Sequence, residues 1–482
     1  MSQNNVDVVV VGAGLSGLSA AQKLQESGKS VVVLEANDRV GGRMLSLPVT
    51  TAEKPAAFDM GAAYLGKTQT ALICLAKELG INMDFSSPDL GLIPTYDKGN
   101  MILYWDKQRK ETDPNSTIPV AGFGPLAALN IMDLFNNQVA PHVKSLTDPL
   151  VPPPAGTTYM EQPWLAPQAQ EWDQLSVEDW LASLRIIDDQ SKELMRTAVN
   201  CVWSAEAHEI SFLYFIWYMA CAGTLDVLLN CHGNGAQAYR FKDGAQNVAQ
   251  LLSKKLADTI TIATNQPVHS IDTVGSETRV STASGEVYTC KDVVVAMSPF
   301  MSSRINYSPA LPDKRVSLLQ RMPIGRTIKC IATYDEPFWR EKYCGMAISN
   351  CTPPVWIMDD TTAEGVNAMM GFVVAEQATE FSALDPEQRK QAITQSFVDI
   401  FGMDEFKNPT GYVEKDWNAE PWAWGCPVGM MAPGAITQFG DALRAPAGAV
   451  HWAGTETATE WQGYMNGAIV AGQRAAKEII GC

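Results

Sequence analysis

The sequence predicts a mixed α/β protein with two interleaved domains, one of them built around a buried parallel sheet. Val8–Val11 is a continuous run of β-branched residues, which is typical of a strand buried on both faces. A glycine-rich turn and a segment with apolar residues at helical spacing follow, and a second apolar run covers Ser30–Leu34. The chain of 482 residues is also too long for a single hydrophobic core.

The glycine-rich turn predicts a Rossmann-like dinucleotide site. Gly12, Gly14 and Gly17 have the spacing G-x-G-x-x-G between the first strand and a helix that Gly28 ends. Gly12 permits a tight turn, Gly14 lets a pyrophosphate approach the backbone, and Gly17 lets the helix pack closely on the strand. The helix N-terminus favours phosphate. Glu35 ends the second strand, where its carboxylate can accept hydrogen bonds from ribose hydroxyls. The turn alone does not separate NAD from FAD.

Composition and charge narrow the class of protein. The net charge of −17 at pH 7 argues against nucleic acid or an anionic membrane surface as a partner. Ten cysteines without a C-x-x-C pair indicate reduced thiols in a cytoplasmic protein and predict no metal site. The uncharged segment Ile210–Leu225 is shorter than the roughly 20 residues that cross a bilayer, so it predicts a buried helix beside a pocket. No secretion signal is expected at the N-terminus, and we expect a soluble protein.

Further segments carry motifs that favour FAD. LEANDRVGGR, residues 34–43, places two glycines between Arg39 and Arg43, so backbone and guanidinium groups can meet phosphate. FDMGAAYLG follows at residues 58–66, and the C-terminal part contains EKDWNAEPWAWGCPVG and HWAGTETATEWQGYMNG. Together these motifs resemble the flavin-dependent amine oxidases, in particular their monoamine oxidase branch, and are most similar to bacterial cyclohexylamine oxidases.

The resemblance covers nearly the whole chain, least well between about residues 90 and 165. It implies the p-hydroxybenzoate hydroxylase-like architecture of flavin amine oxidases, in which a Rossmann-like FAD-binding domain is interleaved with a substrate domain. The implied FAD-binding domain comprises residues 1–84, 243–317 and 420–482, and the implied substrate-binding domain comprises residues 85–242 and 318–419. Between about residues 84 and 158, clustered proline and glycine predict long loops around short helices.

The resemblance also implies a set of residues that contact FAD. They are Gly12, Gly14, Gly17, Glu35, Arg43, Gly61, Ala62, Tyr64, Val268, Trp417, Cys426, Gly454, Thr455, Glu456 and Met465.

Two residues are expected to act on the chemistry. Lys329 matches the family's lysine that holds a water against flavin N5, where a cation would stabilise the reduced ring and assist its reoxidation. Alternation predicts a strand with Lys329, Ile331 and Thr333 on one face. Without the resemblance, a lysine in such a strand is more typical of a solvent-exposed position. Tyr464 matches one of the two aromatic walls that face the flavin.

The expected substrate pocket contains Gln237, Trp356 and Pro427. Trp356 stands where the family has a bulky gate residue, although a plain core tryptophan is the alternative. The animal enzymes pair a flavinylated cysteine with a tyrosine, and here these positions are Cys426 and Pro427. The aromatic cage is therefore half built, which implies a wider site. The same difference slightly favours non-covalent FAD. A thioether bond between FAD and Cys426 is the alternative.

The implied function is FAD-dependent oxidation of small alicyclic or aliphatic primary amines, such as cyclohexylamine. Dioxygen would be the second substrate, and the products would be a ketone or aldehyde, ammonia and hydrogen peroxide. A polyamine oxidase, an L-amino-acid oxidase and a flavin-binding scaffold without turnover are the alternatives. A nicotinamide-dependent dehydrogenase fits less well, because the Arg39–Arg43 loop and the GTET segment suit FAD. We expect a monomer or homodimer without nucleic-acid or membrane partners.

Overall fold

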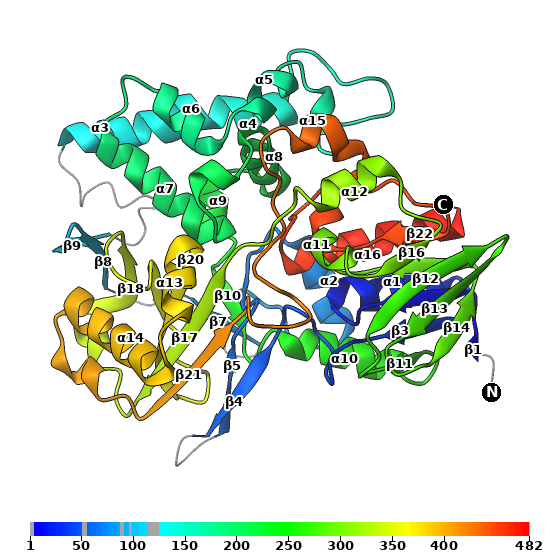
Figure 1. Ribbon diagram of the computed structural model, residues 1–482. Coiled ribbons are helices and arrows are strands. Elements are labelled where there is room, and N and C mark those ends of the chain that lie inside the picture. Colours follow the sequence, from blue (N-terminus) through cyan, green and yellow to red (C-terminus); the bar gives the residue numbers. More distant parts are fainter. Residues whose placement is uncertain (1–3, 51–54, 87–90, 96–98, 114–124, 482) are drawn as a thin grey trace.

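The computed structural model describes residues 4–50, 55–86, 91–95, 99–113 and 125–481. Figure 1 shows two sheet regions side by side and a layer of helices above them. The predicted mixed α/β fold is confirmed, since parallel and antiparallel sheets occur together with helices.

A five-stranded parallel sheet forms the first region. Val8–Val11 forms its central strand, β2, as predicted, and the neighbouring strands come from distant parts of the chain. In spatial order the strands are β11 (Thr261–Ala263), β3 (Val31–Leu34), β2, β15 (Asp292–Val295) and β22 (Val450–Trp452). All four pairings are parallel, and the valines of β2 are buried on both faces, which is typical of a sheet covered on each side.

Three helices cover one face of this sheet, namely α1 (Leu15–Glu26), α10 (Gln246–Leu256) and α16 (Met465–Ile480). Helices α1 and α16 lie side by side although they come from opposite ends of the chain (Figure 1). Gly472 permits this approach, because a Cβ there would lie 2.1 Å from the carbonyl oxygen of Ser16. The two ends of the chain therefore fold into one core.

A second five-stranded sheet covers the other face, where Val9 and Val11 pack with Ile271 and Val280. Its strands, in order, are β1 (Asn4–Asn5), β14 (Val287–Cys290), β13 (Glu277–Thr282), β12 (Val268–Val274) and β16 (Asn306–Ser308).

The other sheet region is a seven-stranded sheet. Its strands, in order, are β21 (Gly411–Asp416), β17 (Thr327–Tyr334), β20 (Asn367–Val374), β19 (Trp356–Asp359), β18 (Tyr343–Ser349), β8 (Asn100–Trp105) and β9 (Gln108–Thr112). Helices α13 (Ala375–Ser382) and α14 (Pro386–Phe401) pack on the face that carries Ile328 and Cys330. The opposite face carries Ile331 and Trp356, and it packs against residues such as Trp417 beside the site.

The prediction of long loops and short helices over residues 84–158 is wrong in part. Strands β7 (Leu92–Pro94), β8 and β9 lie there, and residues 87–90, 96–98 and 114–124 are outside the described part of the chain. β9 has the sequence QRKET and lies at the edge of its sheet. Charged residues are common on edge strands, and here they hide the alternation that predicts a strand.

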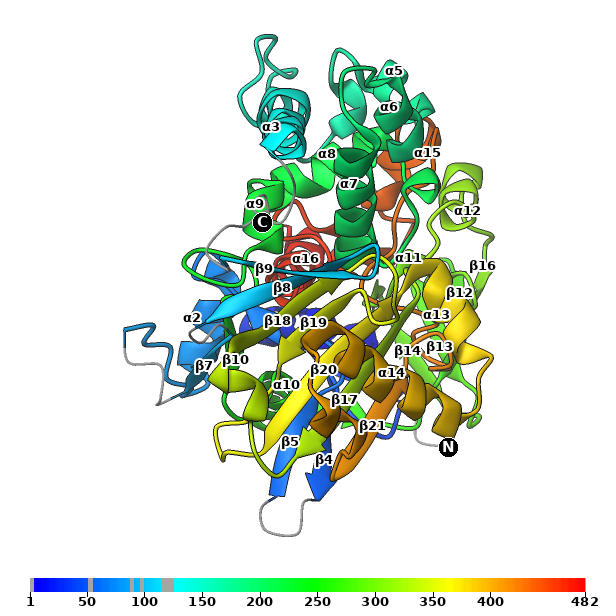
Figure 2. The ribbon, with the colours of Figure 1, turned by 90° about the vertical axis from the view of Figure 1, so that its left-hand side faces the viewer.

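Helices α3 (Pro125–Asp133) to α9 (Leu225–Leu229) form the third layer (Figure 2). Between them lie α4 (Ala140–Thr147), α5 (Ala169–Gln174), α6 (Val177–Ser183), α7 (Asp189–Trp203) and α8 (Phe212–Ala222). The predicted buried helix is confirmed as α8, whose residues from Phe212 to Cys221 are all buried. Among the described residues, no helix combines the length and the apolarity that a bilayer crossing needs.

Short elements connect these layers. They are β4 (Ser46–Thr50), β5 (Pro55–Asp59), β6 (Tyr64–Leu65), α2 (Thr70–Glu78), β10 (Tyr239–Phe241), α11 (Pro299–Ser302), α12 (Asp313–Leu319) and α15 (Ala435–Phe439). The strands of the two five-stranded sheets fall within residues 1–84, 243–317 and 420–482, and those of the seven-stranded sheet fall outside them. The boundaries of the two domains stay a prediction.

Candidate functional site

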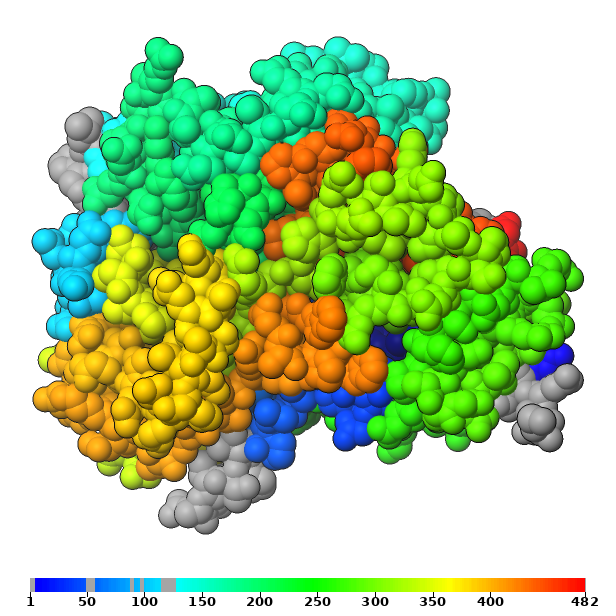
Figure 3. Space-filling model, viewed as in Figure 1, coloured from blue at the N-terminus to red at the C-terminus, as the bar shows by residue number. Residues whose placement is uncertain are grey.

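A cavity of about 490 Å³ lies where the parallel sheet, the seven-stranded sheet and the helical layer meet. This volume lies within the range of small-molecule and cofactor sites. The space-filling view shows a hollow in which dark-blue N-terminal atoms are visible between orange and green segments (Figure 3). Trp422 and Arg304 line the cavity and come from segments of those colours.

One end of the cavity is polar and contains Glu35, which the sequence predicts as the ribose ligand. Its Oε2 accepts a hydrogen bond from the Ala13 N–H at 2.7 Å, and its Oε1 accepts one from the Asn37 N–H at 2.8 Å. Burial raises the pKa of Glu35 above its ordinary value. Val268, at the start of β12, lines the same cavity together with Gln266, whose N–H donates to the Glu35 carbonyl.

The glycine-rich turn lies next along the cavity. Gly12 has φ +102°, and a Cβ there would lie 2.8 Å from the Ala296 carbonyl oxygen. A Cβ on Gly17 would lie 1.9 Å from the Gly12 carbonyl oxygen, so Gly17 serves helix packing and does not line the cavity. Around Gly14, in contrast, the nearest atom to a Cβ would be 4.0 Å away, which leaves room for a ligand.

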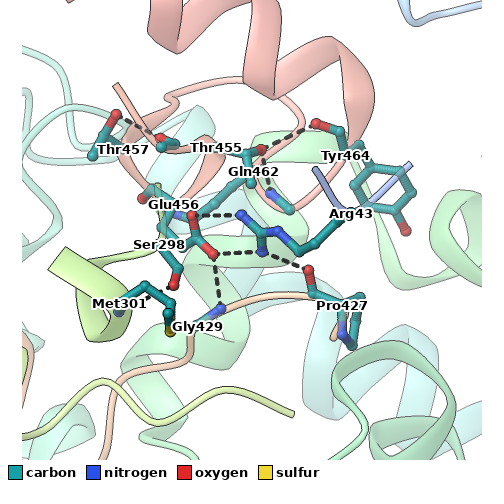
Figure 4. Close-up of polar contacts among 12 residues, drawn as sticks. Arg43, Ser298, Met301, Pro427, Gly429, Thr455, Glu456, Thr457, Gln462 and Tyr464 are labelled. Carbon is teal, nitrogen blue, oxygen red and sulfur yellow. Dashed lines mark hydrogen bonds and ion pairs between the residues drawn. The ribbon is translucent and has the colours of Figure 1, made fainter. Parts of the chain in front are cut away.

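Two helix N-termini face the cavity without a side-chain cap. Gly14 is the N-cap of α1 and Tyr464 is the N-cap of α16, and both residues line the cavity. Uncapped first turns leave backbone N–H groups for an anion, such as phosphate or a ring that collects negative charge. The Thr455 hydroxyl accepts the Gly463 N–H and donates to the Tyr464 carbonyl, both at 3.0 Å, which fixes the turn before α16 (Figure 4). Met465, the first residue of α16, also lines the cavity.

A buried ion pair ties the cavity wall together. Arg43 donates from Nη1 to Oε1 of Glu456 at 2.7 Å and from Nη2 to Oε2 at 3.2 Å (Figure 4). Arg43 also donates to the Pro427 carbonyl at 2.8 Å, and Glu456 accepts the Gly429 N–H at 3.1 Å. Burial lowers the pKa of Arg43, but Glu456 outweighs it and the net shift is upward.

This pair changes the expectation for Glu456, which the sequence places among the FAD contacts. Glu456 is fully buried and does not line the cavity, whereas Arg43, Gly454 and Thr455 do. Its carboxylate orients the Arg43 guanidinium. No sequence signal predicts the pair, because 413 residues separate its members.

The other end of the cavity is apolar. We call it the apolar end and define it by Tyr64, Cys201, Val202, Tyr218, Gln237, Trp356, Phe372, Pro427 and Tyr464. The Tyr218 and Tyr464 rings lie 6.5 Å apart, and Trp356 pairs with Phe372 across β19 and β20. Gln237 donates to the Leu228 carbonyl at 3.1 Å. The structure therefore brings together the three residues expected for the substrate pocket, Gln237, Trp356 and Pro427. Tyr464, expected as an aromatic wall, lines the same end. Their roles stay a prediction.

Trp417 and the segment Gly61–Ala62 form the wall beside this end. The Trp417 indole N–H donates to the Met60 carbonyl at 2.8 Å. A Cβ on Gly61 would lie 2.8 Å from the Trp417 ring, so only glycine permits this packing.

Lys329 does not line the cavity, and its contact with a flavin-bound water stays a prediction. The side chain is fully buried, and its ammonium donates to the Asp59 carbonyl. Its Nζ lies 5.7 Å from the centre of the Tyr64 ring and 5.3 Å from that of Phe372. Because both rings line the cavity, Lys329 lies directly behind the wall of the apolar end.

Cys426 lines the cavity as a free thiol. Burial raises the pKa of this thiol to about 11, although Arg43 and Lys329 lower it. The thiolate is the nucleophilic form of cysteine, so the neutral thiol is a poor partner for a thioether bond. Among the described residues, no group of three or more His, Cys, Asp or Glu side chains could hold a metal ion.

The lining fits an extended FAD. The carboxylate of Glu35 suits a ribose, the open backbone at Gly14 and the two uncapped helix ends suit phosphates and the ring, and Arg43 adds a positive charge. The buried Tyr64 hydroxyl, which has no hydrogen-bond partner among the described residues, is a further polar group at the cavity wall.

Known proteins match this chain over nearly its whole length. A family model described as flavin containing amine oxidoreductase matches residues 15–480. Human amine oxidase [flavin-containing] B is 36% identical over 482 residues, which cover 99% of this chain and 86% of the human protein.

Solved structures give the same result. Wild-type putrescine oxidase bound to putrescine has a TM-score of 0.87 and 26% identity, and cyclohexylamine oxidase from Brevibacterium oxydans IH-35A has a TM-score of 0.85 and 28% identity. Each match covers 99% of both chains. The predicted resemblance to flavin amine oxidases and the predicted mixed α/β fold of that family are confirmed.

Proposed function

Because the chain belongs to the family of flavin-containing amine oxidoreductases and is an enzyme of that family, we propose that it oxidises small primary monoamines with an apolar body. Cyclohexylamine and short aliphatic amines belong to this class. Oxidation of the amine gives an imine, which water hydrolyses to a ketone or aldehyde and ammonia. Dioxygen is the second substrate and is reduced to hydrogen peroxide. When bound, the flavin supplies the hydride acceptor and returns the electrons to dioxygen.

The absence of acidic residues from the apolar end carries the choice of a monoamine. Among the described residues that line the cavity, the only carboxylates are those of Glu35 and Glu420. Both accept hydrogen bonds from Asn37, so they lie together at the polar end. A diamine would place its second ammonium in this end without a counter-charge, and an unpaired buried charge is costly. Putrescine oxidase shares the fold, so the fold does not decide between the two substrate classes, whereas the lining favours the monoamine.

An amino acid is a poorer substrate on the same grounds. Its carboxylate would need a cation near the apolar end, and the Arg43 guanidinium reaches that end, where it donates to the Pro427 carbonyl at 2.8 Å. Both terminal nitrogens of Arg43 already donate to Glu456. Recruiting Arg43 would therefore leave the fully buried Glu456 carboxylate without its cation.

The residues of the apolar end have distinct roles in this proposal. Their apolar and aromatic lining disfavours the ammonium form, so the amine is held as the neutral base. Tyr464, Pro427 and Trp356 all line the cavity. In this proposal the amine binds between Tyr464 and Pro427, and the Trp356 indole limits its length. Lys329, behind the wall, adds positive charge near the place where the ring becomes negative. The neutral Cys426 thiol favours a non-covalent FAD.

A peroxide-coupled assay tests the substrate class. The panel contains cyclohexylamine, a short aliphatic monoamine, putrescine and an L-amino acid, each with the purified holoenzyme. We expect peroxide from both monoamines and at least tenfold lower kcat/KM for putrescine and for the amino acid. Putrescine as the best substrate would contradict the proposal and would indicate a counter-charge that the cavity lining does not contain.

A further inference from the structure

The buried Lys329 needs counter-charges, and the structure shows where they are. Directly across the sheet, β17 places Lys329 opposite Phe372 on β20 and opposite Lys415 on β21. Phe372 is uncharged, and the Lys415 ammonium pairs with Glu420. The positions directly opposite Lys329 therefore offer no free carboxylate, and Glu414 and Asp416 of β21 pair with Cys330 and Ile328 on the other face. Compensation for the Lys329 charge is therefore expected from residues that pack on its own face of the sheet.

Asp59, the last residue of β5, provides the first counter-charge. Its backbone carbonyl accepts a hydrogen bond from the Lys329 ammonium. Its carboxylate is held by the Ala245 N–H at 2.9 and 3.0 Å and by the Ser46 hydroxyl at 2.6 Å. Burial raises the pKa of this carboxyl to about 6, so Asp59 is an anion above that pH.

Asp360 provides the second counter-charge, and hydrogen bonds from Arg240 hold its side chain in place. Arg240 donates from Nη1 to the Asp360 carboxylate and, at 3.2 Å, to the Asp360 carbonyl, and it donates from Nη2 to the Thr361 carbonyl at 3.0 Å. Arg240 pairs with Tyr64 across β10 and β6, and the Tyr64 ring contacts Lys329. All four charged side chains are buried, and their formal charges cancel.

We infer that Asp59 and Asp360 are the counter-charges that keep Lys329 protonated behind the apolar end, and that Arg240 positions Asp360. The inference rests on the proposed function, because it explains how Lys329 could carry charge there. Asp59, Asp360 and Arg240 are positioning residues, since none of them lines the cavity. Buried charges of opposite sign stabilise one another, whereas removal of one member leaves another uncompensated.

The charges around Lys329 have a defined order of influence. Burial has the largest effect and lowers the pKa of Lys329. The charges of Asp360 and then Asp59 raise this pKa, the charge of Arg240 lowers it, and Cys426, which has the smallest of these effects, raises it. Loss of the Asp360 charge therefore lowers the pKa of Lys329 further. The neutral form of Lys329 would then begin at a lower pH.

The first test uses half-reaction kinetics of the holoenzyme across pH 6–10. Flavin reduction by cyclohexylamine and reoxidation by dioxygen are followed by stopped flow in Asp360→Asn, Asp360→Glu and Lys329→Met. We expect at least one half-reaction to slow as Lys329 loses its proton. The midpoint of this decline should move down by about one pH unit or more in Asp360→Asn, return in Asp360→Glu and be absent in Lys329→Met.

The matched control is Asp359→Asn. Asp359 is the adjacent buried carboxylate, but its oxygens accept from Trp339 at 2.7 Å and from Arg340 at 2.6 Å. This variant loses the same charge at the preceding position in the chain. We expect the pH midpoint of its half-reaction decline to stay within roughly 0.3 pH units of the wild-type midpoint. An equal shift in both variants would overturn the inference.

The second test needs no flavin. Because the pKa of Lys329 is lower in the folded protein than its ordinary value of 10.5, the unfolded chain binds that proton more tightly. Lys329 therefore makes the apo-protein more stable as pH rises from its folded pKa towards 10.5. Thermal unfolding should show this rise starting at a lower pH in Asp360→Asn and disappearing in Lys329→Met.

The outcomes distinguish the proposed role of Lys329 in the reaction from the assignment of its counter-charges. Normal half-reactions in Lys329→Met, together with the expected unfolding curves, would remove the proposed role of Lys329 and leave the counter-charges in place. A wild-type kinetic profile and a wild-type unfolding curve in Asp360→Asn would overturn the inference itself. If Asp360→Asn does not fold, Asp59→Asn replaces it, with a shift in the same direction.

Discussion

Substitution of Glu456 by glutamine tests the ion pair that holds the cavity wall. Glu456 is fully buried, and its carboxylate accepts hydrogen bonds from both terminal nitrogens of Arg43 and from the Gly429 N–H. Glutamine keeps the size of the side chain but offers one acceptor oxygen and an NH₂ group. In either orientation that NH₂ group faces a terminal nitrogen of Arg43, and in one of them it also faces the Gly429 N–H. Two donors therefore oppose each other, and Arg43 keeps an uncompensated charge.

The expected loss follows from the burial of the pair. Breaking a buried ion pair from one side costs about 3–5 kcal/mol. The Arg43 side chain keeps 23% exposure, so we expect the lower limit, about 3 kcal/mol. For an unfolding unit the size of the predicted FAD-binding domain, each kcal/mol shifts Tm by roughly 2–4 °C. The apo-protein of Glu456→Gln should therefore melt about 6–12 °C below the wild type.

Differential scanning fluorimetry of the apo-protein measures this shift, and Asp441→Asn is the control. Asp441 pairs with Lys314 at 2.7 Å, but both side chains are at least half exposed, so its loss should cost under about 1 kcal/mol. If Glu456→Gln melted with the wild type, or if both variants lost the same amount, the pair would not hold the wall as described.

Four further predictions follow from the cavity wall and its neighbours. Gly14→Val should fold but lose FAD, because the space at Gly14 is open to the ligand, whereas Gly17→Val should fail to fold; colour and circular dichroism distinguish them. Burial raises the pKa of Asp59 from 3.8 to about 6, so the free energy of unfolding should fall by about 3 kcal/mol as pH rises from 4 to 6. In Asp59→Asn, urea unfolding should show no such fall over this pH range. Acid precipitation should release the flavin from wild type and from Cys426→Ser alike; colour in the wild-type pellet would show a thioether. Trp356→Leu should raise kcat/KM for longer amines by about tenfold relative to cyclohexylamine in the peroxide assay; an unchanged ratio would make Trp356 a core residue only.

The predictions from sequence succeed where local backbone geometry fixes the result. The turn at Gly12 needs a positive φ, and the helix after Gly14 needs an uncapped start, so the motif alone specifies strand, turn and helix. The buried helix α8 is equally local, because its apolar residues leave no polar face.

The remaining features depend on packing between distant segments. Alternation along β17 assigns Lys329 to one face, but the burial of that face depends on β5 and β6, which lie far away in sequence. The pairing of Arg43 with Glu456 likewise requires both ends of the chain to meet. The edge strand β9 is hidden because its charged residues break the apolar alternation.

Anaerobic mixing of the holoenzyme with cyclohexylamine tests the central claim most directly. We predict that the visible flavin absorbance bleaches and that admission of dioxygen restores it, with one hydrogen peroxide formed per flavin. A flavin spectrum that stays unchanged with cyclohexylamine and with short aliphatic monoamines would contradict the account.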